Sequence, residues 1–244
     1  MSVLLSAFYY CYFFVTAALL FIAQALISPL VLLFDRKKKL FHFLTSLWGY
    51  HLVKLNPFWN CSIEGAQFIE EGKSYVIVAN HQSLADVFVL SGIRHNFKWV
   101  SKESLLRIPF FGWNMRLNDY IALKRGDSRS IKSMMANCKQ WLSKGVSIMM
   151  FPEGTRSETG ELGNFRDGSF RLALACNVPI VPIVISGTND VISKRSLKFN
   201  FSGRMKIKVL APVLPETFKG STSKMRDYVH DLMENNLGLL KQEQ

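Results

Sequence analysis

The sequence predicts an α/β fold with a mixed, largely parallel sheet flanked by helices, preceded by an N-terminal membrane helix or helical hairpin. Two observations predict it. After residue 58, short apolar runs rich in β-branched residues alternate with helical patterns, which is typical of strands that helices bury on both faces. Before that point, an uncharged stretch exceeds the roughly 20 residues that a membrane-spanning helix needs. We therefore divide the 244 residues into membrane-anchoring helices at 1–57 and one domain at 58–244.

The N-terminal stretch from Val3 to Phe34 contains no charged side chain, and Asp35-Arg36-Lys37-Lys38-Lys39 follows it directly. Positively charged flanks stay in the cytoplasm, so the domain that follows should face the cytoplasm. A cleaved signal peptide is disfavoured because its positive charge would precede the apolar run. Pro29 leaves a second arrangement open, a helical hairpin that dips into one leaflet without crossing it.

A second helix is predicted over residues 40–55, where apolar residues recur at near-helical spacing. Trp48 and Tyr50 would suit the headgroup depth of a helix that lies in the membrane interface. The same pattern also suits a helix that packs on the following domain. The sequence leaves both possibilities open.

The remaining elements follow from local patterns. Turn signals at Asn56-Pro57 and Glu64-Gly65 place the domain boundary near residue 58. The predicted strands are 74–79, 97–100, 120–123, 146–151, 180–185 and 205–210. The predicted helices are 84–93, 103–117, 128–144, 167–176 and 223–240. Because proline is disfavoured in central strands, Pro179 and Pro182 predict a strand start or an edge strand.

The formal net charge of +12 indicates an anionic partner, which could be nucleic acid, an anionic membrane face or a phosphorylated substrate. The chain has no Lys/Arg-rich tail and no aromatic RNA-binding signature, so nucleic acid is disfavoured. The four cysteines are scattered and show no metal-binding spacing. We expect free thiols and no metal site.

The first candidate site is the block Asn80-His81-Gln82-Ser83-Leu84-Ala85-Asp86, which follows the predicted strand 74–79. Ligands bind at the carboxyl ends of strands in open α/β sheets. If His81 lies in the loop before the helix, its ring can fold back onto Asp86, which would hold one ring nitrogen protonated and leave the other free to take a proton. The plain alternative is that Asp86 completes a capping box that Ser83 begins.

The second candidate site is Phe151-Pro152-Glu153-Gly154-Thr155-Arg156-Ser157, at the end of the predicted strand 146–151. The planar guanidinium of Arg156 suits a phosphate, and Gly154 lets backbone approach a ligand closely. A plain turn with a surface arginine is the alternative. Further cations that could bind phosphate are Lys102, Lys124 and Arg125.

In order and spacing, these elements resemble the glycerolipid acyltransferase family, and most of all its 1-acyl-sn-glycerol-3-phosphate acyltransferases. The resemblance covers residues 74–187 and rests on the NHxxxxD block, the FPEGTR block and the apolar run 178–184. It implies that His81 is the general base and Asp86 its partner. The substrate-binding residues that it implies are Lys102, Arg125, Glu153, Gly154, Thr155 and Arg156.

The resemblance implies transfer of an acyl group from acyl-CoA or acyl-ACP, as co-substrate, to the sn-2 hydroxyl of 1-acyl-glycerol 3-phosphate, giving phosphatidic acid in phospholipid biosynthesis. It implies no cofactor and no metal. The partners would be membrane lipids, lysophosphatidic acid and the acyl-CoA or acyl carrier protein, without nucleic acid. We expect a membrane location with the catalytic domain at 58–244 facing the cytoplasm, and backbone N–H groups near Ser83 and Leu84 that stabilise the oxyanion.

Two alternatives remain. The acceptor could be another lyso-lipid, such as lyso-ornithine lipid or lysophosphatidylglycerol, or glycerol 3-phosphate. A non-catalytic membrane lipid-binding protein is disfavoured, because a binder has no need of an intact His81 and Asp86.

Overall fold

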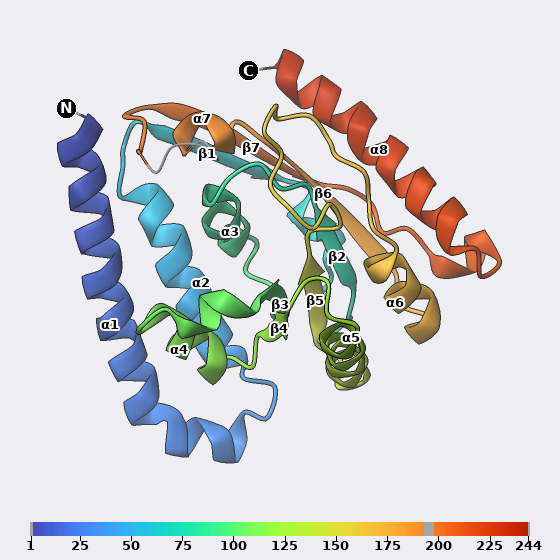
Figure 1. The fold of residues 1–244 in the computed structure, drawn as a ribbon, viewed down its shortest axis with the longest axis horizontal. Helices are drawn as coiled ribbons and strands as arrows, with labels where there is room; N and C mark the ends of the chain where they lie inside the picture. The colour runs from blue at the N-terminus through green and yellow to red at the C-terminus, as the bar shows by residue number, and fades with distance from the viewer. Residues whose placement is uncertain (1, 193–197, 244) are drawn as a thin grey trace.

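The computed structural model describes residues 2–192 and 198–243, and its centre is one sheet of seven strands (Figure 1). Across the sheet the strand order is β1-β7-β6-β2-β5-β3-β4. The strands are β1 (Trp59–Glu64), β2 (Val76–Ala79), β3 (Phe97–Lys102), β4 (Ile121–Leu123), β5 (Ser147–Met150), β6 (Ile180–Ser186) and β7 (Gly203–Val209). Every neighbouring pair is parallel except β6 and β7. The predicted mixed, largely parallel sheet is confirmed.

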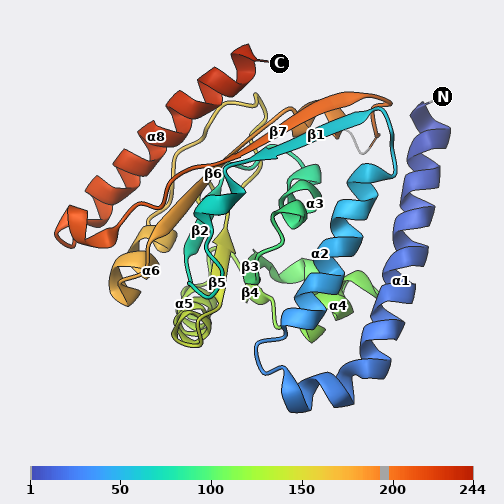
Figure 2. The same ribbon diagram turned by 180° about the vertical axis from the view of Figure 1, so that it is seen from behind.

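Helices cover both faces of the sheet (Figures 1 and 2). They are α1 (Ser2–Phe34), α2 (Lys39–Lys54), α3 (Ala85–Leu90), α4 (Phe111–Leu117), α5 (Ser128–Ser143), α6 (Gly168–Cys176), α7 (Thr188–Val191) and α8 (Thr222–Gln242), with short 3-10 turns at η1 (Ala66–Phe68), η2 (Ser91–Ile93), η3 (Glu103–Arg107) and η4 (Pro215–Phe218). The side chains of β2 alternate between two cores: Ile77 packs with α3, and Val76 and Val78 pack with α5, α6 and α8. A strand buried on both faces explains its continuous apolar sequence.

Three local predictions differ from the structure. Strand β1 was not predicted, because it is a half-exposed edge strand whose sequence lies among turn signals. The predicted helix 103–117 is broken into η3 and α4, since Pro109 and the positive φ of 60° at Phe110 interrupt it. The short helix α7 was also not predicted.

The expectation that Pro182 lies at a strand start or on an edge strand is wrong. Pro182 lies inside β6, between β7 and β2. Proline is tolerated here because the pairing of β6 with β7 begins one residue later, at Ile183. At Pro182 only the carbonyl takes part in a hydrogen bond toward β7, so the missing N–H is not required. That carbonyl accepts the N–H of Leu210 at 2.9 Å.

Helix α1 packs against α2 and α4 (Figure 1). Near one end, Tyr9 stacks on Trp59 of β1, with ring centroids 5.1 Å apart. Further along, Phe21 meets Trp113 of α4 edge-on at 5.4 Å. By length and composition, Val3–Phe34 is the one helix among the described residues that could cross a membrane.

A buried amide fixes α1 to two other helices. Gln24 is fully buried and donates to the carbonyl of Phe41 and the hydroxyl of Thr45 in α2, both at 3.1 Å. It accepts a hydrogen bond from Asn114 of α4 at 2.9 Å. A buried amide must be hydrogen-bonded, so this network favours one position of α1 against the domain.

Helix α2 packs on the domain, which is one of the two arrangements that the sequence left open. Its buried residues, among them Phe41 and Leu52, face the domain, and it packs on α3. Leu40, Phe43 and Leu47 stay exposed on the other side. The exposed large apolar side chains of α1 are Val3, Leu4, Phe8, Phe14, Val15, Leu19, Ile22, Leu26, Ile27, Leu30, Leu32, Leu33 and Phe34. The two helices therefore present an apolar surface away from the sheet.

Candidate active site

Asp86 is fully buried and its carboxylate accepts four hydrogen bonds. Oδ2 accepts from the Nδ1 of His81 at 2.7 Å and from the backbone N–H groups of Gln82 and Ser83 at 2.7 and 2.9 Å. Oδ1 accepts from the Thr188 hydroxyl at 2.5 Å. A carboxylate with this many donors is satisfied in its charged form although no water reaches it. It orients the His81 ring and leaves Nε2 as the nitrogen that can take a proton.

Asp86 makes one half of the capping box that was the plain alternative, and it also binds His81. The Asp86 carboxylate accepts the N–H of Ser83, as in a capping box, but the Ser83 hydroxyl accepts the N–H of Ala85 at 3.1 Å and not that of Asp86, so the reciprocal box is not formed. The Ser83 N–H is engaged by Asp86. Of the two N–H groups expected to stabilise the oxyanion, only that of Leu84 is left for this role.

The backbone of His81 is held on both sides by the second candidate block. Its N–H donates to Oε1 of Glu153 at 2.7 Å, and its carbonyl accepts the N–H of Ser157 at 2.7 Å. The other oxygen of Glu153 accepts the N–H of Gly163 at 3.0 Å. Burial raises the pKa of the Glu153 carboxyl, and these two N–H donors oppose that shift. Glu153 thus positions His81 through its backbone N–H.

The His81 ring lies flat on Phe151, with centroids 3.9 Å apart and planes 11° from parallel. Trp99 also stacks on Phe151, with ring centroids 5.8 Å apart. These rings, from the ends of β2 and β5 and from β3, restrict the imidazole to one plane. The stack and the Asp86 hydrogen bond together fix the direction in which Nε2 points.

Asn80, the first residue of the block, has a structural role. Its side chain donates to the carbonyl of Ile185 at 2.9 Å and accepts the N–H of the same residue at 2.7 Å. The amide thus continues the pairing of β2 with β6 by one step. This contact holds the loop that carries His81 against β6 and brings Thr188 next to Asp86.

His81 lines a cavity of about 370 Å³. Most of the wall is apolar, and α2 contributes to it through Trp48 and Gly49. Apolar residues that line the cavity include Leu84, Val87, Phe88, Trp99, Leu105 and Phe111. The arrangement suits a substrate with a long apolar chain and one reactive polar group.

Three exposed cations also line the cavity: Lys102, Arg125 and Arg166. Lys102 and Arg125 were predicted, and the structure brings them to the same cavity as His81. Gly154 lines it as well, with a φ of +71° that favours glycine. The cavity therefore combines an apolar wall with positive charge.

The other predicted substrate-binding residues lie differently. Thr155 is exposed and Arg156 half-buried, and neither is among the residues that line the cavity. Glu153 is buried beneath His81. The substrate-binding roles of these three residues stay predictions.

Sequence reasoning missed Thr188, the stacking role of Phe151, and Arg166. Thr188 lies just after β6, as His81 lies just after β2. A polar residue directly after the predicted strand 180–185 could therefore have indicated a site residue. Phe151 stood inside the quoted block. Arg166 had no signal, because its approach to Gly154 depends on how the intervening loop folds back.

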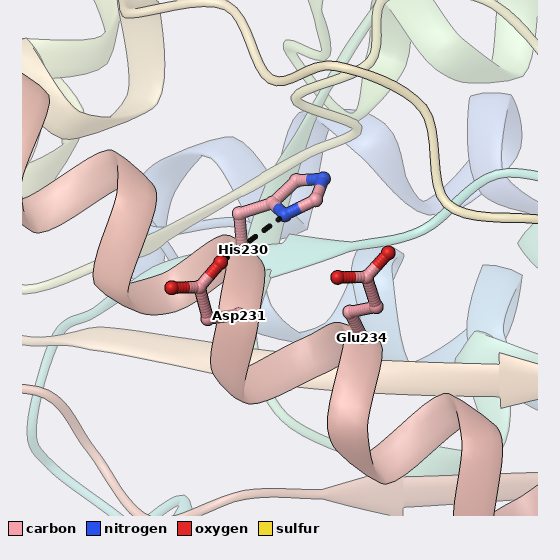
Figure 3. A group of neighbouring side chains, drawn as sticks. All are labelled: His230, Asp231 and Glu234. Atoms are coloured by element: carbon pink, nitrogen blue, oxygen red, sulfur yellow. Dashed lines mark ion pairs between the residues drawn. The ribbon is translucent and has the colours of Figure 1, made fainter.

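One group of side chains among the described residues could hold a metal ion, and it lies apart from this site. His230, Asp231 and Glu234 share α8, and Figure 3 shows them side by side on one helix. Nδ1 of His230 lies 3.8 Å from a carboxylate oxygen of Asp231. Both carboxylates are exposed and none of the three residues lines the His81 cavity.

The chain is similar to known acyltransferases in sequence and in fold. The Acyltransferase family profile matches residues 60–186. The chloroplastic 1-acyl-sn-glycerol-3-phosphate acyltransferase of Arabidopsis thaliana is 34% identical over 201 residues, which are 82% of this chain and 56% of that protein. The 1-acyl-sn-glycerol-3-phosphate acyltransferase of Saccharomyces cerevisiae is 32% identical over 206 residues, which are 82% and 67% of the two chains.

A solved structure is also similar. The crystal structure of the 1-acyl-sn-glycerophosphate acyltransferase PlsC from Thermotoga maritima superposes with a TM-score of 0.73 at 27% identity and covers 93% of this chain and 95% of that one. The chain spans little more than half the length of the plant relatives that it matches.

Proposed function

The chain belongs to the acyltransferase family, and we propose that it transfers an acyl group from a thioester to the sn-2 hydroxyl of 1-acyl-glycerol 3-phosphate, giving phosphatidic acid. The observation that carries this proposal is the His81–Asp86 pair, which opens on an apolar cavity that also bears cations. The names of the relatives support lysophosphatidic acid as the acceptor.

In the proposed reaction, Nε2 of His81 takes the proton of the acceptor hydroxyl as its oxygen attacks the thioester carbonyl. A carbon–oxygen bond forms, the carbon–sulfur bond breaks, and His81 returns the proton to the departing thiolate. The buried carboxylate of Asp86 balances the imidazolium that forms between these steps. No serine or cysteine nucleophile is required, because the substrate supplies the hydroxyl.

The cavity supports a lipid acceptor over a small polar one. An acyl chain would lie against apolar residues such as Leu105 and Phe111, which removes apolar surface from water. Lys102 and Arg125 would attract the phosphate of the acceptor. The Leu84 N–H is the remaining candidate for the oxyanion.

Acyl transfer by the purified protein in detergent tests the proposal. With acyl-CoA and acyl-ACP offered in parallel, we expect the highest kcat/KM for lysophosphatidic acid among a panel of acceptors. That panel includes glycerol 3-phosphate, lysophosphatidylglycerol and lyso-ornithine lipid. A higher kcat/KM for another acceptor would reassign the substrate, and a protein inactive with every acceptor would remove the enzymatic proposal. The difference between the two donors identifies the thioester that the protein uses.

We further propose that α1 and α2 lie in one leaflet, with the domain in the cytoplasm. Helix α1 is hydrogen-bonded through Gln24 to α2 and α4. It could therefore cross a bilayer only if these hydrogen bonds broke or if α2 and α4 also entered the bilayer. The basic stretch 35–39 favours the cytoplasmic side for the turn between α1 and α2.

An impermeant maleimide applied to intact cells tests this topology. In a Cys11→Ser background, we expect Val3→Cys at the start of α1 and Ser223→Cys on α8 to be protected until the membrane is permeabilised. Labelling of Val3→Cys alone in intact cells would show that α1 spans the bilayer. Labelling of Ser223→Cys would place the domain outside.

A further inference from the structure

The amino-terminal end of α6 opens on the same cavity as His81. Gly168 and Ser169, the first two residues of this nine-residue helix, line it. The first main-chain bond of the helix is from the N–H of Arg171 to the carbonyl of Asp167. Within the described part of the chain, the N–H groups of residues 168–170 have no acceptor, and the Asp167 side chain does not cap them. Unpaired N–H groups at a helix start attract anions.

Ser169 adds an unsatisfied hydroxyl to this end. The residue is only 3% exposed, and its Oγ has no hydrogen-bond partner among the described residues. Buried hydroxyl groups are normally paired, so this one points to a missing acceptor. A rotation about one side-chain bond lets a serine hydroxyl follow an acceptor placed at the cavity wall.

Arg166 supplies a charge at the same place. It lines the cavity, and its guanidinium lies over the FPEG turn, where a Cβ on Gly154 would come within 2.8 Å of its Nε. Its N–H donates to the carbonyl of Pro152 at 2.9 Å, which ties the loop to this turn. Gly154 therefore leaves room for the Arg166 side chain.

The acidic groups near Arg166 are engaged elsewhere. The carboxylate of Asp167 is held by Arg171 at 3.1 Å and by Arg226 at 2.8 Å. Glu161 pairs with Lys241 of α8 at 2.7 Å. Within residues 2–192 and 198–243, Arg166 itself has no acidic partner. Its charge is thus left for a ligand in the cavity.

We propose that Arg166, the Ser169 hydroxyl and the free N–H groups at the start of α6 form a binding site for a phosphate monoester. The ligand is the phosphate of the lipid acceptor, an assignment that rests on the proposed function. The site differs from the predicted one at Arg156, which does not line the cavity. The phosphate held at α6 and the acyl chain held by the apolar wall would together orient the sn-2 hydroxyl toward His81.

Binding of inorganic phosphate to the full chain, followed by ³¹P NMR, tests the site without catalysis. Arg166→Gln should weaken phosphate binding by on the order of 10- to 100-fold, and Ser169→Ala by about 3- to 10-fold.

Gly168→Asp is the sharpest variant. A Cβ at this position meets open space, and an acidic residue suits the first turn of a helix, so the protein should fold. The added carboxylate should repel phosphate. Arg94→Gln is the matched control: Arg94 follows η2 in the turn that leads into β3, and so lies toward the amino-terminal end of that strand, away from the carboxyl ends that carry His81, and the variant should bind phosphate as the wild type does. Equal phosphate binding by wild type and Gly168→Asp would overturn the site.

Kinetics then identify the source of the phosphate. The ratio of kcat/KM for lysophosphatidic acid to that for 1-monoacylglycerol, which lacks the phosphate, should fall by on the order of 10-fold or more in Arg166→Gln and keep its wild-type value in Arg94→Gln. If the variant instead loses the preference for acyl-CoA over acyl-dephospho-CoA, the site binds the donor and the acceptor assignment is wrong. A wild type that binds phosphate but does not acylate lysophosphatidic acid would overturn the proposed function and leave the anion site standing.

Discussion

His81→Ala should lower kcat by about 10²- to 10⁴-fold, the contribution of a positioned general base. The imidazole is the group that the structure aims into the cavity, since Asp86 holds its Nδ1 and Phe151 fixes its plane. Removing it leaves no other histidine and no carboxylate among the described residues that line the cavity. The measurement is acyl transfer under saturating donor and acceptor, with circular dichroism to check the fold.

His230→Ala is the matched control for this variant. His230 lies on α8 and does not line the cavity, so its removal should leave kcat within about twofold of the wild type. Because the backbone of His81 carries the contacts to Glu153 and Ser157, alanine at this position keeps them and the loop should stay in place. Full activity of His81→Ala would falsify the general-base role.

Asp86→Asn should reduce kcat by on the order of 10³- to 10⁴-fold with little loss of fold, by analogy with the buried aspartate of serine protease triads. Asparagine keeps the size and one oxygen of the carboxylate, so the N–H groups of Gln82 and Ser83 retain an acceptor. The negative charge that balances the imidazolium is lost. Steady-state kinetics and thermal unfolding of the same preparation separate the two effects.

Thr188→Val provides a graded companion to Asp86→Asn. Valine has nearly the shape of threonine but removes the hydroxyl that donates to Oδ1 of Asp86, which leaves a buried acceptor unpaired at about 1–3 kcal/mol. We expect lower stability and a smaller loss of kcat than in Asp86→Asn. Because His81 and Asp86 act as a unit, the double variant that combines His81→Ala with Asp86→Asn should be about as inactive as His81→Ala alone. Losses that multiply in the double variant would mean that the two residues act independently.

The positions of most elements could be predicted from the sequence, because strands buried on both faces and amphipathic helices leave local patterns. Six of the seven strands lie where apolar runs predicted them. Strand β1 was not predicted, because only some residues of this edge strand are buried and its sequence therefore lacks a continuous apolar run. The helix 103–117 was overextended because periodicity alone did not show that Pro109 and Phe110 interrupt it.

The roles within the two motif blocks were only partly accessible. The pairing of His81 with Asp86 could be inferred, since both residues lie in one short block. The positioning role of Glu153 could not, because it depends on a hydrogen bond to the backbone of His81, 72 residues away. The same holds for Thr188, which reaches Asp86 across a separation of 102 residues.

The sequence by itself determined the class of fold, the apolar N-terminal helix and the polar blocks at two strand ends, because each is a property of neighbouring residues. The tertiary structure decided which of these groups meet. The strand order places β2 between β6 and β5, so the ends of three strands that are distant along the chain lie side by side. That order brings Thr188 and His81 to the buried carboxylate of Asp86 and Phe151 to the His81 ring, and the loop after β5 folds back to bring Arg166 and the start of α6 to the same cavity. Such contacts depend on how strands pair and how loops close, and no local pattern encodes them.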